Sequence, residues 1–236
     1  MKIALVVGAS GTLGSEIIDE LLIKEYDVYG LYNSHIPNIN NKHFFPYKYD
    51  LNVDNNYDKL VTKLNSYDKV TSFIVIYASG IYSKCKIEEF DSHEFIKYLN
   101  INSLGFMNLY KNIFNFIKKC NITNIILIGS NLLKHKNKGS IYYNLSKSLQ
   151  EQIVKQVAYE HGVYNVLINQ ISPGIFISNM NSNIDEEKLN NIKNNIPLKR
   201  ISNSKEIAKF ICNFCINNTF ITGETILMDG GNTIGY

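Results

Sequence analysis

The sequence of 236 residues lacks the patterns that mark several common classes of protein. It has no long block of Lys or Arg, and its net charge of +3 is small, so its composition gives no argument for nucleic-acid binding. The apolar run at residues 3–7 is interrupted by Gly8, too early for a signal peptide or a membrane span. Five histidines are scattered without a pair at metal-ligand spacing. We therefore expect a cytoplasmic protein without a metal site.

Cysteine is also scarce, with four residues in the chain. Without an export signal these thiols are expected to be reduced. Cys212 and Cys215 have the spacing of a redox or half-zinc motif, but a redox motif needs its first Cys at a helix N-terminus. Here the pair falls late in an apolar segment, residues 207–216, that has a helical pattern. We interpret both as core residues.

The first pattern that is present is a short apolar strand, residues 2–7, followed by a glycine-rich turn and an amphipathic helix. The turn holds Gly8, Gly11 and Gly14, which let the backbone bend sharply and approach a pyrophosphate. The N-terminus of the helix stabilises the negative charge of such a group. Strand, turn and helix in this order predict a dinucleotide site.

The second predicted strand, residues 27–32, ends without an acid. A site that selects NAD usually has a carboxylate there, which binds the ribose 2′-hydroxyl. This strand is followed instead by Asn33 and Ser34, polar groups that do not repel a 2′-phosphate. The sequence therefore favours NADP(H) over NAD(H), with His35 and Lys42 as the nearest basic residues.

Strand and helix patterns alternate along the rest of the chain. Asp50 follows the third strand and is placed to bind an adenine amino group or to cap the next helix, which Asp54 or Asn55 would do equally well. This alternation predicts one α/β domain over residues 1–236, a doubly wound parallel sheet of about seven strands with helices on both faces. The further strands are expected at residues 43–49, 72–78, 124–128, 166–171 and 225–228.

Two helical segments have features of their own. Residues 92–119 contain Asn102, a poor helix former, followed by Gly105, which predicts a kink or a local opening unless the Asn is simple surface polarity. Asn203, with Glu206 three residues later, is expected to cap the last helix. Between these segments, the polar residues 178–195 form a candidate substrate lid or a surface connection.

The segment around Tyr143 carries the strongest candidate for chemistry. Tyr143 and Lys147 are four residues apart, so on a helix their side chains lie on one face. An ammonium group near a phenol favours the phenolate and lowers its pKa towards the physiological range. Ser130 ends a predicted strand, the usual place for a site in parallel sheets, but Ile128 and Leu132 replace the glycines of a hydrolase elbow. A serine nucleophile is therefore not expected.

With these residues the chain resembles the short-chain dehydrogenase/reductase family over essentially its full length. Asn102, Ser130 and the Tyr143-x-x-x-Lys147 pair match the active-site residues of that family, and the interval of 13 residues from Ser130 to Tyr143 is typical of it. Residues 196–200 and 221–231 are similar to segments of its 3-oxoacyl-[acyl-carrier-protein] reductase-like members. The resemblance implies a single-domain Rossmann fold.

Some motifs depart from the family pattern. In the Thr-Gly-x-x-x-Gly-x-Gly turn, Val7 replaces the Thr, Thr12 stands at the middle glycine position and Gly11 lies one residue earlier. Ala78-Ser79-Gly80 replaces Asn-Asn-Ala-Gly, and Ser178, after Pro173-Gly174, stands where Thr is common. The departures concern contacts to the cofactor rather than the fold.

The resemblance also implies roles for individual residues. Tyr143 would protonate a carbonyl oxygen as NADPH delivers hydride, Ser130 would bind the same oxygen, and Asn102 would hold a water that returns the proton. Lys147 would bind the nicotinamide ribose and lower the pKa of Tyr143. The cofactor would contact Gly8, Ser10, Gly11, Thr12, Leu13, Gly14, Asn33, Ser34, Asp50, Leu51, Ala78, Ser79, Gly80, Tyr143, Lys147, Pro173, Gly174, Phe176 and Ser178.

By the same resemblance the substrate is a 3-oxoacyl thioester of fatty-acid or polyketide type. The alternatives are another small ketone, alcohol or sugar derivative, or a noncatalytic NADP-binding regulator. The basic loop Lys134–Lys138, together with Lys118 and Lys119 before the same strand, is a candidate contact for an acidic carrier protein or simply a solvated loop. A homo-oligomer, dimer or tetramer, is expected through the helices that hold Asn102 and Tyr143.

Overall fold

A computed structural model of the chain describes residues 1–53, 56–134, 137–178 and 184–234. Its centre is a seven-stranded sheet in which every neighbouring pair of strands is parallel. The predicted fold class is therefore confirmed. The strands are β1 (Lys2–Val7), β2 (Asp27–Tyr32), β3 (Phe44–Lys48), β4 (Ser72–Tyr77), β5 (Thr123–Ile128), β6 (Val166–Pro173) and β7 (Thr225–Met228).

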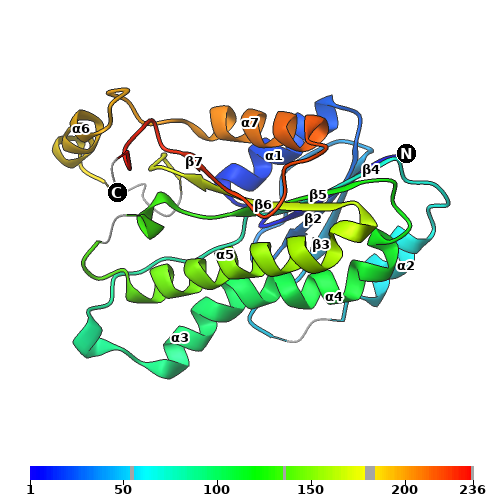
Figure 1. Ribbon diagram of the computed structural model, residues 1–236, viewed down its shortest axis with the longest axis horizontal. Helices are drawn as coiled ribbons and strands as arrows, with labels where there is room; N and C mark the ends of the chain where they lie inside the picture. Colours follow the sequence, from blue (N-terminus) through cyan, green and yellow to red (C-terminus); the bar gives the residue numbers. More distant parts are fainter. Residues whose placement is uncertain (54–55, 135–136, 179–183, 235–236) are drawn as a thin grey trace.

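The order of the strands across the sheet is β3-β2-β1-β4-β5-β6-β7. The chain builds outwards from β1 in one direction and then restarts at β4 on the other side of β1 (Figure 1). This reversal leaves a crevice at the carboxyl ends of β1 and β4, the position where open parallel sheets bind ligands.

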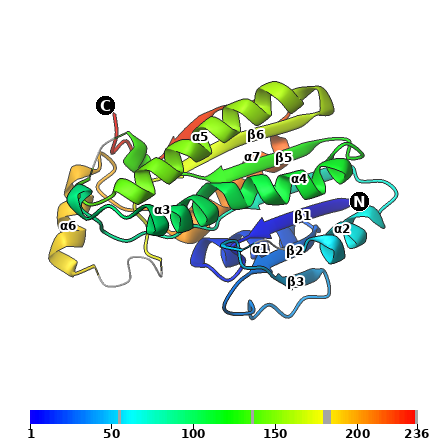
Figure 2. The same cartoon turned by 90° about the horizontal axis from the view of Figure 1, so that it is seen from below.

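Helices cover both faces of the sheet. Figure 1 shows α1 (Thr12–Ile23) and α7 (Ser204–Asn217) on one face, with α2 (Asp58–Asn65), α4 (Gly105–Ile117) and α5 (Ile141–His161) on the other. Figure 2, which views the second face, shows α3 (Ser92–Leu99) continuing the line of α4 alongside α5. The remaining helix, α6 (Glu186–Asn195), lies beyond the carboxyl edge of the sheet (Figure 1).

The two layers of helices explain why the central strands are almost wholly apolar. Along β1, Ile3 and Leu5 enter the core under α2, α4 and α5, while Ala4 and Val6 enter the core under α1 and α7. All four side chains are fully buried. Burying a large aliphatic side chain contributes about 1.5–3 kcal/mol, so both faces of the sheet are strongly held. Strands of this kind read as apolar runs without alternation.

The predicted opening of the helix at Asn102 is confirmed. Residues Asn100–Leu104 form a π-helix between α3 and α4, and the Gly105 N–H donates to the Asn100 carbonyl five residues back. Tyr77 on β4 donates its hydroxyl to the Ile101 carbonyl at 2.7 Å. A Cβ on Gly105 would lie 2.6 Å from that hydroxyl, so the glycine leaves the space in which Tyr77 reaches the backbone.

Other helix expectations had mixed outcomes. The Asn203 side chain accepts from the Glu206 N–H at 2.9 Å and caps α7, as predicted. The next helix after β3 is not capped by Asp50, whose carboxylate accepts from the Asn52 N–H in its own turn. Asn56 accepts from the first N–H of α2 instead, and Asp54 and Asn55 lie outside the described residues.

Cys212 and Cys215 are core residues, as predicted. Both lie on α7 and are only 1% exposed. Burial raises the pKa of the Cys212 thiol to about 12, so it is not a reactive thiolate. In the described part of the chain no cluster of His, Cys, Asp and Glu could hold a metal ion. No helix there is long and apolar enough to cross a membrane.

Candidate active site

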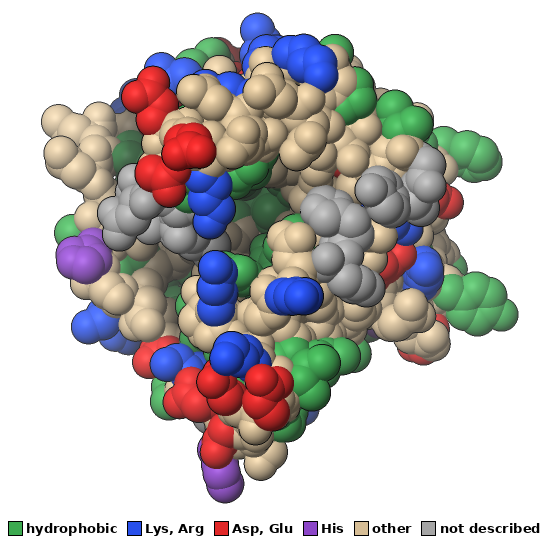
Figure 3. Space-filling view, turned by 90° about the vertical axis from the view of Figure 1, so that its left-hand side faces the viewer, with side chains coloured by type: hydrophobic (Ala, Val, Ile, Leu, Met, Phe, Trp, Pro, Cys, Tyr) green, Lys and Arg blue, Asp and Glu red, His purple; other side chains and the backbone are tan. Residues whose placement is uncertain are grey.

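The predicted site residues gather at the carboxyl edge of the sheet. Figure 3 views this edge, which is hollowed at its centre and has Lys and Arg side chains around the hollow. Val7 and Tyr77 are paired at the ends of β1 and β4, and the Ala78 N–H donates to the Val7 carbonyl at 2.9 Å. The glycine turn after β1 and the loop after β4 therefore start side by side.

The glycine turn has the shape of a phosphate cradle. Gly8 has a positive φ of 86°, and a Cβ on it would lie 2.9 Å from the Ser79 nitrogen. A Cβ on Gly14 would lie 2.1 Å from the Gly8 carbonyl oxygen. The backbone of the turn and the backbone of the helix are therefore too close for a side chain at Gly14. Gly11 is the N-cap of α1 and offers no side chain to its first N–H groups. Those N–H groups fit an anion such as a pyrophosphate.

Asn102 fixes the loop that follows β4. Its Oδ1 accepts from the Ile81 N–H at 2.8 Å, and its Nδ2 donates to the Ile81 carbonyl at 3.2 Å and to Ser146 Oγ at 2.8 Å. A Cβ on Gly80 would lie 3.5 Å from both Asn102 Oδ1 and Lys147 Nζ. The loop thus passes directly from the glycine turn to the buried ammonium.

Ser130 and Tyr143 meet where β5 ends and α5 begins. Their side chains are hydrogen-bonded, which lowers the pKa of Tyr143, but burial outweighs this bond and leaves that pKa above its ordinary value. The ring of Tyr82, in the loop after β4, packs edge-on against the Tyr143 ring at 5.3 Å and also raises its pKa. The phenol therefore keeps its proton at neutral pH.

In this structure burial, Ser130 and Tyr82 set the pKa of Tyr143, and the predicted contribution of Lys147 is not among its causes. Lys147 is 2% exposed, and its ammonium donates to the Ile128 carbonyl at 2.5 Å rather than to the phenol. Its Nζ lies 5.9 Å from the centre of the Tyr143 ring. Burial lowers the pKa of Lys147 to about 7, because a charged group loses its hydration there.

The end of β2 opens into a groove of about 940 Å³ beside α1. Of the two basic residues expected near the end of β2, the exposed His35 lines this groove, together with Ser10 of the glycine turn, whereas Lys42 is not among its lining residues. Lys205, from the first turn of α7, lines it too, together with the acids Glu16, Asp19 and Glu20. Sequence reasoning missed Lys205 because only the packing of α7 against α1 brings it to β2.

The other residues predicted at the cofactor lie around the same edge. Asn33 and Ser34 are exposed after β2, and Leu51 is half-buried, with Cδ2 3.2 Å from where a Cβ on Gly105 would be. Phe176 and Ser178 are half-buried beyond β6, at the limit of the described residues.

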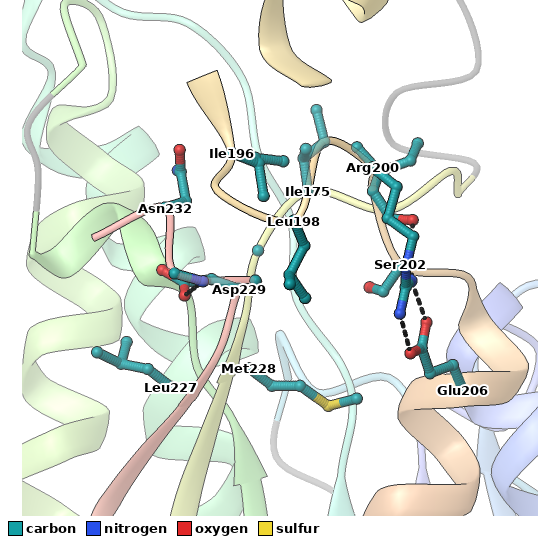
Figure 4. Close-up of a pocket in the computed structure, with 14 residues that line it drawn as sticks. Ile175, Ile196, Leu198, Arg200, Ser202, Glu206, Leu227, Met228, Asp229 and Asn232 are labelled. Atoms are coloured by element: carbon teal, nitrogen blue, oxygen red, sulfur yellow. Dashed lines mark hydrogen bonds and ion pairs between the residues drawn. The ribbon is translucent and has the colours of Figure 1, made fainter. Parts of the chain in front are cut away.

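β6 ends at Pro173, and the following Gly174 lines a small pocket of about 190 Å³. Figure 4 shows its apolar walls and the paired hydrogen bonds of Arg200 to Glu206, which are 2.8 and 2.7 Å long. None of Asn102, Ser130, Tyr143 and Lys147 lines this pocket. It therefore borders Gly174, one of the residues predicted to contact the cofactor, without containing the candidate catalytic groups.

The basic residues proposed for a carrier protein do not lie together. Lys134 and Lys138 are exposed after β5, near Ser130, and residues 135–136 lie outside the described part of the chain. Lys118 and Lys119 precede β5, so they lie at the opposite end of a six-residue strand, roughly 20 Å away. Lys119 donates to Asn65 at the end of α2. The inclusion of these two lysines in the site was wrong.

The candidate lid is partly helical. Residues 186–195 form α6, and the Asp185 side chain caps it by accepting from the Lys188 N–H at 2.7 Å. Residues 179–183 of the same stretch lie outside the described residues.

Comparison with known proteins agrees with this geometry. A family model described as "Enoyl-(Acyl carrier protein) reductase" matches residues 34–233. The 3-oxoacyl-[acyl-carrier-protein] reductase FabG of Buchnera aphidicola subsp. Schizaphis graminum is 29% identical, over 98% of this chain and 96% of its own length.

Two solved structures share the fold. A short chain dehydrogenase family protein from Francisella tularensis matches with a TM-score of 0.82 at 24% identity, covering 99% of both chains. The aldohexose dehydrogenase of Thermoplasma acidophilum matches with a TM-score of 0.85 at 21% identity, covering 100% of this chain and 95% of its own. The glycine turn, the strand-end serine and the Tyr-Lys helix, taken with these matches, place the chain in the short-chain dehydrogenase/reductase family of oxidoreductases.

Proposed function

We propose that this protein is an NADPH-dependent carbonyl reductase that converts 3-oxoacyl thioesters, linked to acyl carrier protein or to coenzyme A, into 3-hydroxyacyl thioesters. The observation that carries the proposal is the contact of Ser130 with Tyr143 beside the buried Lys147, at the edge that also holds the glycine turn. The similarity to a 3-oxoacyl-[acyl-carrier-protein] reductase over nearly the whole chain supports the substrate class.

The site residues account for the chemistry of a ketone reduction. A reduced nicotinamide, when bound, would supply the hydride for the carbonyl carbon. Tyr143 would donate its phenolic proton to the carbonyl oxygen, and Ser130 would hydrogen-bond the same oxygen. One hydride and one proton would thus convert the C=O bond into C–H and O–H. The ammonium of Lys147 would bind the nicotinamide ribose and stabilise the phenolate that remains on Tyr143.

The raised pKa of Tyr143 suits this direction of reaction. A general acid must carry its proton before the reaction begins, and a phenol with a raised pKa does so at neutral pH. The loss of that proton during the reaction would be favoured by a positive charge, which the Lys147 ammonium, 5.9 Å from the centre of the ring, would supply when it is protonated.

Asn102 has a positioning part in this proposal. Its side chain holds the backbone of Ile81 and the hydroxyl of Ser146, so it joins the loop after β4 to α5. This contact sets the position of Gly80 beside Lys147, where the cofactor would pass.

We further propose that the protein works as a cytoplasmic homo-oligomer, dimer or tetramer, and that its substrate can arrive on an acidic carrier. The exposed Lys134 and Lys138 near the end of β5 support docking of a negatively charged partner at the site mouth.

A substrate panel tests the proposed function. We expect NADPH oxidation with acetoacetyl thioesters, with a lower KM for the carrier-linked form than for the coenzyme A form. Simple ketones, sugars and the enoyl thioester crotonyl-coenzyme A provide the comparison. The 3-oxoacyl assignment fails if a member of the comparison set reacts and the acetoacetyl thioesters do not. Absence of all turnover with retained NADPH binding would instead favour a noncatalytic regulator.

The cofactor preference rests on the groove beside α1. Lys205 supplies a positive charge on the groove wall, beside the imidazole of His35 and Ser10 of the glycine turn. The acids of α1 in the same groove would repel a 2′-phosphate if Lys205 were absent.

Replacing Lys205 with Ala tests this preference. We expect the KM for NADPH to rise about three- to fivefold, the scale of an exposed charge pair of up to about 1 kcal/mol. The KM for NADH should not change, because NADH has no 2′-phosphate. Lys209→Ala, one turn further along α7 and outside the groove, is the matched control. Equal effects on both cofactors, measured by steady-state kinetics, would contradict a role for Lys205 in selection.

A further inference from the structure

Gln150 is a fully buried polar residue that no predicted role uses. It lies on α5 three residues after Lys147 and is 0% exposed. Its Nε2 donates to the Asn102 main-chain carbonyl at 3.0 Å, and its Oε1 accepts from Lys147 Nζ at 3.4 Å. The side-chain amide thus bridges the π-helix and the buried ammonium.

The bridge determines the orientation of the amide. An ammonium offers only donors and a carbonyl offers only acceptors, so Oε1 must face Lys147 and Nε2 must face Asn102. An apolar side chain at this position would remove both bonds and leave buried polar atoms without them. A carboxylate would place a negative charge beside Lys147 and an acceptor against the Asn102 carbonyl.

Few groups around the Lys147 ammonium can stabilise its charge, and the Gln150 amide is one of them. From β5 the ammonium meets the Ile128 carbonyl, and on the side of the loop after β4 a Cβ added to Gly80 would lie 3.5 Å from its Nζ. The titratable group that faces it on α5 is Tyr143, with Tyr82 packed behind that ring. The three ion pairs found among the described residues do not include Lys147. The oxygens that stabilise its charge are therefore a backbone carbonyl and the Gln150 amide.

We propose that Gln150 is a positioning residue of the reductase site, whose amide holds the Lys147 ammonium charged and aligned between the π-helix and β5. The inference rests on the proposed function for its kinetic consequence, because a charged Lys147 is what the reaction needs. Gln150 itself touches neither substrate nor cofactor in this scheme. It acts through Lys147, and the π-helix supplies the carbonyl that anchors it.

Two substitutions should shift the pKa of Lys147 in opposite directions. Gln150→Met keeps the length of the side chain but removes the acceptor, so the pKa of Lys147 should fall by about 0.5–1 unit. Gln150→Glu keeps the shape and adds a negative charge within hydrogen-bond reach, so the pKa should rise by about 1–2 units. Since burial alone lowers that pKa to about 7, both shifts fall in an accessible pH range.

The test combines kinetics with a direct titration. In acetoacetyl thioester reduction, the pH above which kcat declines should move down for Gln150→Met and up for Gln150→Glu. Gln152→Met and Gln152→Glu, at an exposed position on the same helix, make the same chemical changes away from the site and should leave the profile in place. Thermal unfolding of each variant identifies any that fails to fold.

NMR titration of isotopically labelled lysine, with Lys147→Arg to assign the signal, measures the same pKa without any turnover. Opposite shifts for the two Gln150 variants support the proposal. Unchanged pKa values, or shifts of both variants in one direction, would overturn it. A general loss of packing would not move the pKa of Lys147 down in one variant and up in the other. If no thioester is reduced but the shifts occur, the proposed function fails and the positioning of Lys147 by Gln150 stands.

Discussion

Replacing Tyr143 with Phe is expected to lower kcat about 10²- to 10⁴-fold while NADPH still binds with nearly unchanged affinity. The substitution removes the hydroxyl that would give its proton to the substrate oxygen and keeps the ring that packs against Tyr82. Ser130 keeps its position after β5, where its Oγ also accepts from the Leu132 N–H at 3.2 Å. The loss should therefore appear in kcat and not in the cofactor Kd, measured by NADPH fluorescence.

Tyr142→Phe is the matched control, because this neighbouring tyrosine is buried and its ring packs against Phe95 and Tyr98 of α3. Its hydroxyl accepts from the Asp91 N–H at 2.7 Å, at the N-cap of α3. Removing it should cost about 1 kcal/mol of the free energy of unfolding and leave kcat within about twofold. Turnover by Tyr143→Phe at the level of Tyr142→Phe would refute the assignment of Tyr143 as the acid.

The fold could be predicted because its signals are local. The residues of β4 from Phe73 to Tyr77 are fully buried, because helices cover both faces of the strand. A strand of this kind is recognisable in the sequence as a continuous apolar run. The opening at Asn102 could also be predicted, because Asn102 and Gly105, three residues later, are both poor helix formers. By contrast, α6 buries none of its residues, so residues 178–195 contain no apolar stripe from which this helix could be predicted.

The site could be predicted less completely, because its chemistry depends on packing between distant segments. The spacing of Tyr143 and Lys147 indicates that they share a helix face, but not that burial raises one pKa and lowers the other. Gln150 has no motif, and its role depends on the carbonyl of Asn102. Lys118 and Lys119 could have been excluded from the site by their sequence position, since residues before a parallel strand lie away from the edge where sites form.

Gly14→Ala is expected to have the second large effect, on stability and on cofactor binding together. The new Cβ would lie 2.1 Å from the Gly8 carbonyl oxygen and 2.9 Å from its carbon, both backbone atoms. The turn cannot yield cheaply, because the Gly8 N–H donates to the Leu31 carbonyl and the Gly8 carbonyl accepts from the Gly11 N–H, both at 3.0 Å.

Overpacking of this kind costs about 3 kcal/mol, which corresponds to a fall in Tm of roughly 6–12 °C for a chain of this size. Any shift of the turn that relieves the contact moves the N–H groups proposed to hold the pyrophosphate, so the NADPH Kd should rise more than about tenfold. Gly162→Ala, whose Cβ would meet nothing within 4 Å, should leave both quantities unchanged or raise Tm slightly. A Gly14→Ala protein that melts and binds NADPH like the Gly162 variant would show that this turn is not the close backbone contact on which the cofactor site depends.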